Sequence, residues 1–267
     1  MAIDLEKVKA RLKKLETKND QANFVWKPSP GTQVIRIVPY IHSEDDFPFI
    51  ELYFDYEVTS RSTLSPITYG RPDPIAEFAE KLKATNNSDD YKMGKKIEPK
   101  ERYFAQVIVR GEENEGVKFW GFGKTVYLEL LKYIADPDYG DITDLENGRD
   151  ITVEFKKPED TGKSYPTTEI RMKPNTSAVG SGKQILDAIK NQRKIGEIYA
   201  EPTYDELADK LKKYLNPEDE EAETVDQTPA TTKTPDTKIN NAPVAPAEVA
   251  KSAEDLNAKF ASLFDKK

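Results

Sequence analysis

Positive charges and aromatic rings gather in one stretch of the chain, residues 100–124. It reads as a hairpin, with RYFAQVIVR over 102–110, the loop GEENEG, and VKFWGF over 117–122. Strand alternation puts Lys118, Trp120 and Phe122 on one face. Cations neutralise phosphates, and flat rings stack on unpaired bases at roughly 1–3 kcal/mol per base. This mixture is typical of a groove for single-stranded nucleic acid.

The predicted groove combines the basic and aromatic side chains of this hairpin. Its residues are Lys100, Arg102, Tyr103, Phe104, Arg110, Lys118, Trp120, Phe122 and Lys124. The other interpretation of the same pattern is that the rings belong to the core and the cations only flank them in water. We favour the groove for the cluster as a whole. The pattern does not settle whether further tyrosines, such as Tyr56 or Tyr165, line it.

Residues suited to catalysis are scarce. The chain has one histidine, His42, beside the acidic loop SEDD and without a partner at a motif spacing. There is no phosphate-binding GxxxxGK[ST] loop, and GFGK at 121–124 lacks the rest of a dinucleotide fingerprint. The absence of cysteine excludes disulfides and thiolate metal sites and fits a reducing compartment. We therefore predict a binding protein and not an enzyme.

Short strands and helices must position these side chains. Period-two patterns predict strands over 33–38, 47–58, 102–110, 117–122, 150–155 and 167–173. Helical spacing predicts helices over 74–84, 124–135, 183–195 and 203–215, the last with a capping box of Thr203 and Glu206. The prediction is an α+β protein, with an OB-fold-like β-barrel core, a helical subdomain and further helices.

Composition divides the chain into four parts. The net charge is −8, but acidic residues crowd just after residue 216 while lysines stud the first twenty residues. We predict a basic arm over 1–20, a core over 21–215, a disordered acidic linker over 216–250 and an amphipathic tip over 251–267. No apolar run could span a bilayer, and the first residues are too charged for a signal peptide, so we expect a cytoplasmic protein with no membrane partner.

The hairpin and the helix after it carry a family resemblance. The stretch RYFAQVIVRGEENEGVKFWGFGKTVYLELLKYIA resembles the single-stranded DNA-binding, helix-destabilising proteins of T-even-type bacteriophages. VWKPSPGTQVIRIVPY and PTYDELADKLKKYL match the same family in the same order. The resemblance implies sequence-nonspecific DNA binding in replication, recombination and repair. It also places Tyr103 and Phe104 at a DNA-stacking pair, Trp120 at another DNA contact, and Lys100 and Arg102 in a basic run.

The same resemblance implies roles for the two ends of the chain. The arm would dock on a neighbouring protomer and make binding cooperative, through Lys9, Arg11, Lys13 and Lys14. The acidic linker would compete with DNA for the groove. The tip would contact replication proteins through Leu256, Phe260, Leu263 and Phe264. A protein-interaction scaffold and a single-stranded RNA-binding barrel are the alternatives left open.

One feature of the family is missing from the sequence. The resemblance implies a subdomain with a structural zinc held by three cysteines and a histidine. The matching stretch, TSRSTLSPITYGRPDPIAEF at 59–78, contains neither residue type. Serine, threonine and aspartate at these spacings make no plausible tetrahedral zinc site. We predict no cofactor and no metal, with the subdomain held by packing of Tyr69, Ile75 and Phe78.

Overall fold

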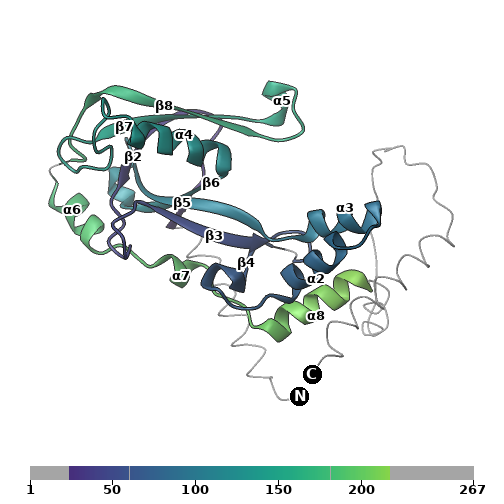
Figure 1. Ribbon diagram of the computed structural model, residues 1–267. Helices are drawn as coiled ribbons and strands as arrows, with labels where there is room; N and C mark the ends of the chain where they lie inside the picture. Colours follow the sequence, from purple (N-terminus) through teal and green to yellow (C-terminus); the bar gives the residue numbers. More distant parts are fainter. Residues whose placement is uncertain (1–23, 60, 181, 217–267) are drawn as a thin grey trace, which may run out of the picture. The chain divides into compact units, whose positions relative to one another are not determined.

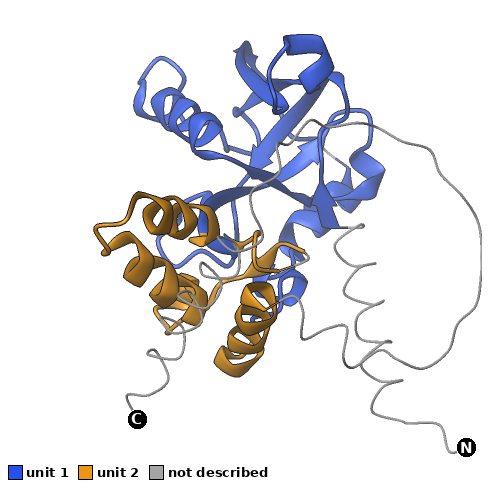
Figure 2. Ribbon diagram, turned by 90° about the vertical axis from the view of Figure 1, so that its right-hand side faces the viewer, with its two compact units in different colours: residues 1–54, 100–201 blue, residues 55–99, 202–267 orange. Residues whose placement is uncertain are grey.

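The computed structural model describes residues 24–59, 61–180 and 182–216. The described chain forms two compact units, shown in two colours in Figure 2. Unit 1 contains residues 24–54 and 100–201, and unit 2 contains residues 55–99 and 202–216. The predicted arm and tip, and all of the predicted linker beyond Asn216, lie outside the described residues.

Unit 1 is built on a curved sheet. Its strands are β1 (Val25–Trp26), β2 (Gly31–Val38), β3 (Phe49–Asp55), β5 (Lys100–Val109), β6 (Lys118–Phe122), β7 (Arg149–Lys156) and β8 (Thr167–Thr176). The strand order is β1-β6-β5-β2-β7-β8, and β3 pairs with β5. Strand β5 is central because Lys100–Ala105 pairs with β3, Gln106–Val109 pairs with β2, and β6 pairs with it as well.

Apolar residues from these strands form the main hydrophobic core of unit 1. Ile35, Ile37 and Val107 are fully buried, and Trp26 meets Trp120 edge to face with ring centroids 5.8 Å apart. Helix α4 (Lys124–Ala135) adds buried Leu130 to this cluster and packs against β5 and β8, as Figure 1 shows. The predicted α+β class is confirmed, because this sheet and its helices share one core.

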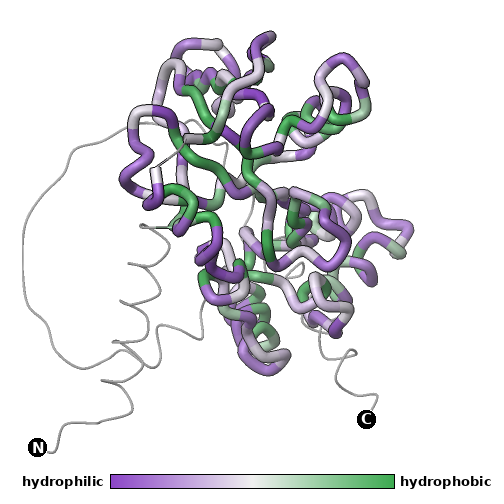
Figure 3. Tube along the Cα trace, turned by 90° about the vertical axis from the view of Figure 1, so that its left-hand side faces the viewer, coloured by the Kyte–Doolittle hydropathy of each residue, from purple (hydrophilic) through white to green (hydrophobic). Residues whose placement is uncertain are grey.

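The remaining helices of unit 1 are short. They are α5 (Pro158–Thr161), the 3-10 turn η2 (Glu113–Glu115), α6 (Lys183–Lys190) and α7 (Ile195–Ile198). The single helix predicted over 183–195 is wrong, because α6 ends at Lys190 and a non-helical linker precedes α7. Figure 3 colours the chain by hydropathy and shows hydrophobic stretches alternating with hydrophilic ones along the trace.

Unit 2 consists of three helices and short connecting elements. These are β4 (Thr63–Leu64), the turn η1 (Pro66–Tyr69), α2 (Pro74–Lys83), α3 (Ser88–Ile97) and α8 (Tyr204–Leu215). The sequence predicted α2 and α8 but missed α3. Thr203 accepts a hydrogen bond from the Glu206 N–H, and the Glu206 carboxylate accepts one from the Thr203 N–H, which confirms the predicted capping box.

Packing of apolar side chains holds unit 2 together. Ile75, Phe78, Leu82, Leu207 and Leu211 are fully buried in one cluster. Burying each such side chain contributes about 1.5–3 kcal/mol. The predicted roles of Ile75 and Phe78 in this core are confirmed. The third predicted residue is wrong, because Tyr69 is 46% exposed and lies on the surface.

Candidate nucleic-acid interface

Three of the predicted cations lie at one end of the β5–β6 pair. Tyr103 pairs with Phe122, so the register brings the start of β5 beside the residues that follow β6. A Cβ atom added at Gly123 would lie 3.5 Å from Nη1 of Arg102. Lys100, Arg102 and Lys124 are all exposed. We call these three residues the cationic patch.

The first turn of α4 adds to the positive potential of this patch. Its N-cap is Gly123, which brings no side-chain acceptor, and the first turn contains no acidic residue. The first backbone N–H groups of a helix have no intrahelical acceptor, and the helix dipole places partial positive charge at this end. Exposed cations around such a helix start suit the binding of phosphate groups.

The four aromatic side chains that we predicted to stack on bases are buried in this structure. The exposed fractions are 3% for Tyr103, 4% for Phe104, 1% for Trp120 and 4% for Phe122. A stacking ring must offer an open face, so these four assignments are corrected to core residues. Alternation did separate the two faces of each strand, but both faces turn out to be covered.

Each face of β5 and β6 has its own cover. Tyr103, Trp120 and Phe122 point into the main cluster of unit 1. Phe104 points the other way and packs against Tyr199, with ring centroids 5.6 Å apart. A Cβ atom added at Gly121 would lie only 2.8 Å from the Phe104 ring, so the missing side chain lets this ring pack close against β6. The rings are therefore part of the packing that shapes the strands.

A cluster of tyrosines and glutamates fixes the ring of Tyr103. It stacks on Tyr127 with ring centroids 3.8 Å apart and an interplanar angle of 16°. The Tyr127 hydroxyl donates to Glu51 over 2.6 Å, and the Tyr53 hydroxyl donates to Glu101 over 3.4 Å. Burial, and then these carboxylates, raise the pKa of Tyr103 and of Tyr127. The stacking and the hydrogen bond from Tyr127 to Glu51 therefore hold the two rings in place.

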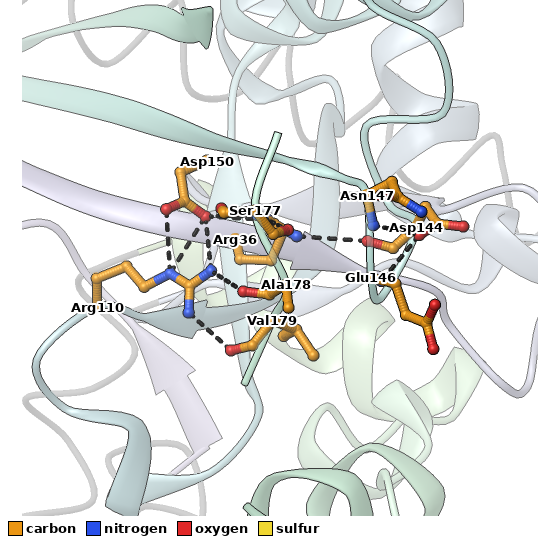
Figure 4. A network of polar contacts seen from close by, with 9 residues as sticks. All are labelled: Arg36, Arg110, Asp144, Glu146, Asn147, Asp150, Ser177, Ala178 and Val179. Atoms are coloured by element: carbon orange, nitrogen blue, oxygen red, sulfur yellow. Dashed lines mark hydrogen bonds and ion pairs between the residues drawn. The ribbon is translucent and has the colours of Figure 1, made fainter. Parts of the chain in front are cut away.

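The predicted contacts Arg110 and Lys118 have protein partners instead. The Arg110 guanidinium donates to the Asp150 carboxylate over 2.9 Å and to the Val179 carbonyl over 2.7 Å (Figure 4). Lys118 forms an ion pair with Glu115, and its side chain is only 15% exposed. We correct both to structural roles, because their positive charges are already neutralised within the fold.

Arg36, on β2, completes the network in Figure 4. Its guanidinium is fully buried and donates to Asp150 over 3.0 Å and to the Ser177 carbonyl over 2.8 Å. Burial lowers the pKa of Arg36, while the Asp150 carboxylate opposes that shift. One carboxylate thus serves two arginines and ties β2 and β7 to the segment after β8.

Several exposed tyrosines offer the open ring faces that the buried four lack. On unit 1, Tyr165 is 60% exposed in the turn between β7 and β8, and the Lys163 ammonium lies 5.9 Å from its ring centroid. On unit 2, Tyr69 has Arg71 at 5.2 Å, and Tyr91 is 48% exposed on α3. The signal for Tyr165 was the turn sequence GKSYP, which sets a ring beside a lysine where no strand can cover it.

The stretch that would hold the family's zinc has other chemistry. Ser65 donates to the Asp73 carboxylate, and Asp73 caps α2, so these two polar side chains are engaged with each other and with the backbone. Among the described residues, no group of three or more histidine, cysteine, aspartate or glutamate side chains could hold a metal ion. The donor set does not fit zinc. No helix in the described ranges is long and apolar enough to cross a membrane.

A curved sheet in an α+β fold, with exposed cations around a helix start, fits the class of nucleic-acid-binding proteins. A family model described as gp32 DNA binding protein like matches residues 29–217, more than two thirds of the chain. The chain therefore belongs to this DNA-binding family, which confirms the resemblance found in the sequence. A comparison with curated proteins finds no match.

Proposed function

We propose that this protein coats single-stranded DNA cooperatively and without sequence preference, in phage DNA replication, recombination and repair, and that it has no catalytic activity. Membership of the gp32-like DNA-binding family supports the DNA-binding part. The observation that carries the proposal is the cationic patch at the start of α4. A cytoplasmic location is the expectation from a sequence without cysteine.

Phosphate contacts carry most of the proposed binding. Lys100, Arg102 and Lys124 pair with successive phosphates, and the first N–H groups of α4 donate hydrogen bonds to the oxygens of one of them. Such contacts position the strand but read no base edge, so they tolerate any sequence. Exposed rings beside cations, of which Tyr165 with Lys163 is the example on unit 1, provide faces on which bases stack.

The two chain ends have the roles that the family resemblance implies. In this proposal the basic arm contacts the next protomer on the strand, the tip binds other replication proteins, and the acidic linker competes with DNA for the patch. A tethered acidic segment has a high effective concentration near a basic surface. Deleting residues 216–267 should therefore tighten DNA binding, measured by titration at fixed salt. Unchanged or weaker affinity would rule out the competition.

A titration of three labelled ligands tests the proposal as a whole. Fluorescence anisotropy is recorded with oligo-dT, with oligo-rU and with a DNA duplex of equal length, at low and at moderate salt. We expect tight binding of oligo-dT that weakens with salt, and weaker binding of the duplex. Equal or tighter binding of oligo-rU would point to an RNA-binding protein. No binding of any ligand would favour the protein-interaction scaffold.

A further inference from the structure

Unit 2 contains a buried carboxyl group without a visible partner. Asp55 is fully buried, and neither of its carboxylate oxygens accepts a hydrogen bond in the structure. An ionised carboxylate in such a place loses its hydration and gains nothing in exchange, which costs several kcal/mol. The fold must therefore either keep Asp55 protonated or place a compensating charge beside it.

The neighbouring carboxyl group, Asp73, has the opposite surroundings. It is also buried, but its Oδ1 accepts from the N–H groups of Ile75 at 2.8 Å and Ala76 at 3.3 Å, at the N-terminus of α2. Its Oδ2 accepts the hydroxyl hydrogen of Ser65. Three donors and the helix dipole all stabilise the negative form of this group. The negative charge of the pair therefore belongs on Asp73.

Two further ionisable groups bear on this pair. Lys210 on α8 acts on Asp55 in the direction that favours its ionised form. Tyr204 lies close enough to Asp73 to feel its charge, but its hydroxyl donates to Glu77 over 2.9 Å. The dominant influences on Asp55 remain its burial and then the charge of Asp73, which together raise its pKa to about 8.

We propose that Asp55 holds a structural proton and shares it with the ionised Asp73. The bound proton links Asp55 to the N-terminal turn of α2 inside unit 2. Asp73 lies within residues 59–78, the stretch where the family resemblance implies zinc, and Asp55 lies just before it. In this proposal the shared proton joins two segments of unit 2 in that region. Two carboxylates and one hydroxyl are too few ligands for a buried divalent cation, and the nearby Lys210 disfavours a second positive charge.

The sign of the resulting pH dependence follows from proton counting. Unfolded aspartate titrates near pH 4, whereas the folded Asp55 retains its proton up to about pH 8. Between these values the folded state binds one more proton than the unfolded state. Stability contributed by this site is therefore complete below about pH 4 and falls as pH rises, by up to about tenfold in the folding equilibrium constant per pH unit. Above about pH 8 this loss levels off.

Chemical denaturation of the full chain from about pH 5 to about pH 9 tests the proposal. The substitution Asp55→Asn keeps the shape of the protonated acid and replaces its O–H donor by an amide N–H donor, but the amide cannot titrate. We expect the wild type to lose stability with rising pH and D55N to show a flatter profile. Asp209→Asn, on the exposed side of α8 in the same unit, should keep the wild-type profile. A wild-type profile retained in D55N would overturn the proposal.

Infrared spectroscopy gives a second readout that does not depend on the variant folding. The wild type at neutral pH should show the C=O stretching band of a protonated carboxylic acid, and a folded D55N should lack it. Absence of that band in the wild type would overturn the proposal. So would stabilisation of the wild type, but not of D55N, by added Mg²⁺ or Zn²⁺ with loss of the band, because a metal ion would then occupy the site. These outcomes are independent of DNA binding.

Discussion

Two arginines at opposite ends of β5 have opposite surroundings. Arg110 follows the last residue of β5, and its guanidinium binds the Asp150 carboxylate and the carbonyls of Ala178 and Val179. Arg102 lies near the other end, exposed and beside Gly123 at the start of α4. Both were predicted to bind DNA from the same sequence pattern. Only Arg102 lies where a phosphate could approach it from solvent.

The difference shows how burial divides charged residues between folding and function. Arg36 and Arg110 both depend on Asp150. The Arg36 guanidinium is fully buried and the Arg110 side chain is only 21% exposed, so without this carboxylate neither has full compensation for its lost hydration. The three side chains of the cationic patch lie at the surface and keep their hydration, so their charges cost the fold little stability. We therefore expect changes at the network to alter stability, and changes at the patch to alter DNA affinity.

The largest predicted effect comes from the shared carboxylate. Asp150→Asn removes the negative charge between the two arginines and should lower the free energy of unfolding by about 3–5 kcal/mol. Urea denaturation measures the loss. Glu154→Gln provides a matched control, because Glu154 pairs with Lys156 at 3.3 Å in a part-exposed position on the same strand, where a loss of no more than about 1 kcal/mol is expected. Equal losses in both variants would refute a special role for Asp150.

Local patterns predicted several elements of both units well. Strands β5 and β6, helix α4 and the capping box of Thr203 follow from spacing within a few residues. The sequence could not show that both faces of β5 are covered, because the covers of Phe104 and of Tyr103 come from distant segments, such as Tyr199. For the same reason the rings were predicted as stacking platforms. Periodicity tells which side chains share a face, and only the fold decides whether that face meets solvent.

Charge patterns had the same limit. Arg110 and its acceptor Asp150 are separated by 40 positions, and the carbonyl acceptors lie further on. No local motif connects them. By contrast, Lys100 and Lys124 remain exposed because they begin a strand and a helix, where side chains project from element ends. The pairing of Asp55 with Asp73 could not be predicted from the sequence either. The two residues are distant in sequence, and only the fold shows that Asp73 accepts the N–H groups of α2 while Asp55 accepts none.

A second prediction concerns the exposed ring of unit 1. Tyr165→Ala should weaken binding of oligo-dT by the value of one stacked base, about 1–3 kcal/mol. Tyr165→Phe keeps the ring and should bind nearly as the wild type does. Because the side chain is 60% exposed, the melting temperature should hardly change in either variant. Full affinity in Tyr165→Ala would show that bases stack elsewhere, for example on Tyr69 or Tyr91.

The most direct test of the cationic patch is the salt dependence of oligo-dT binding by a triple variant with alanine at Lys100, Arg102 and Lys124. Each lost phosphate contact should reduce the slope of log K against log salt by about 0.7 for a single strand, so a total reduction of about 2 is expected. Stability should stay close to that of the wild type, because all three side chains are exposed. An unchanged slope in the folded triple variant would contradict the assignment of the patch as the DNA-binding surface.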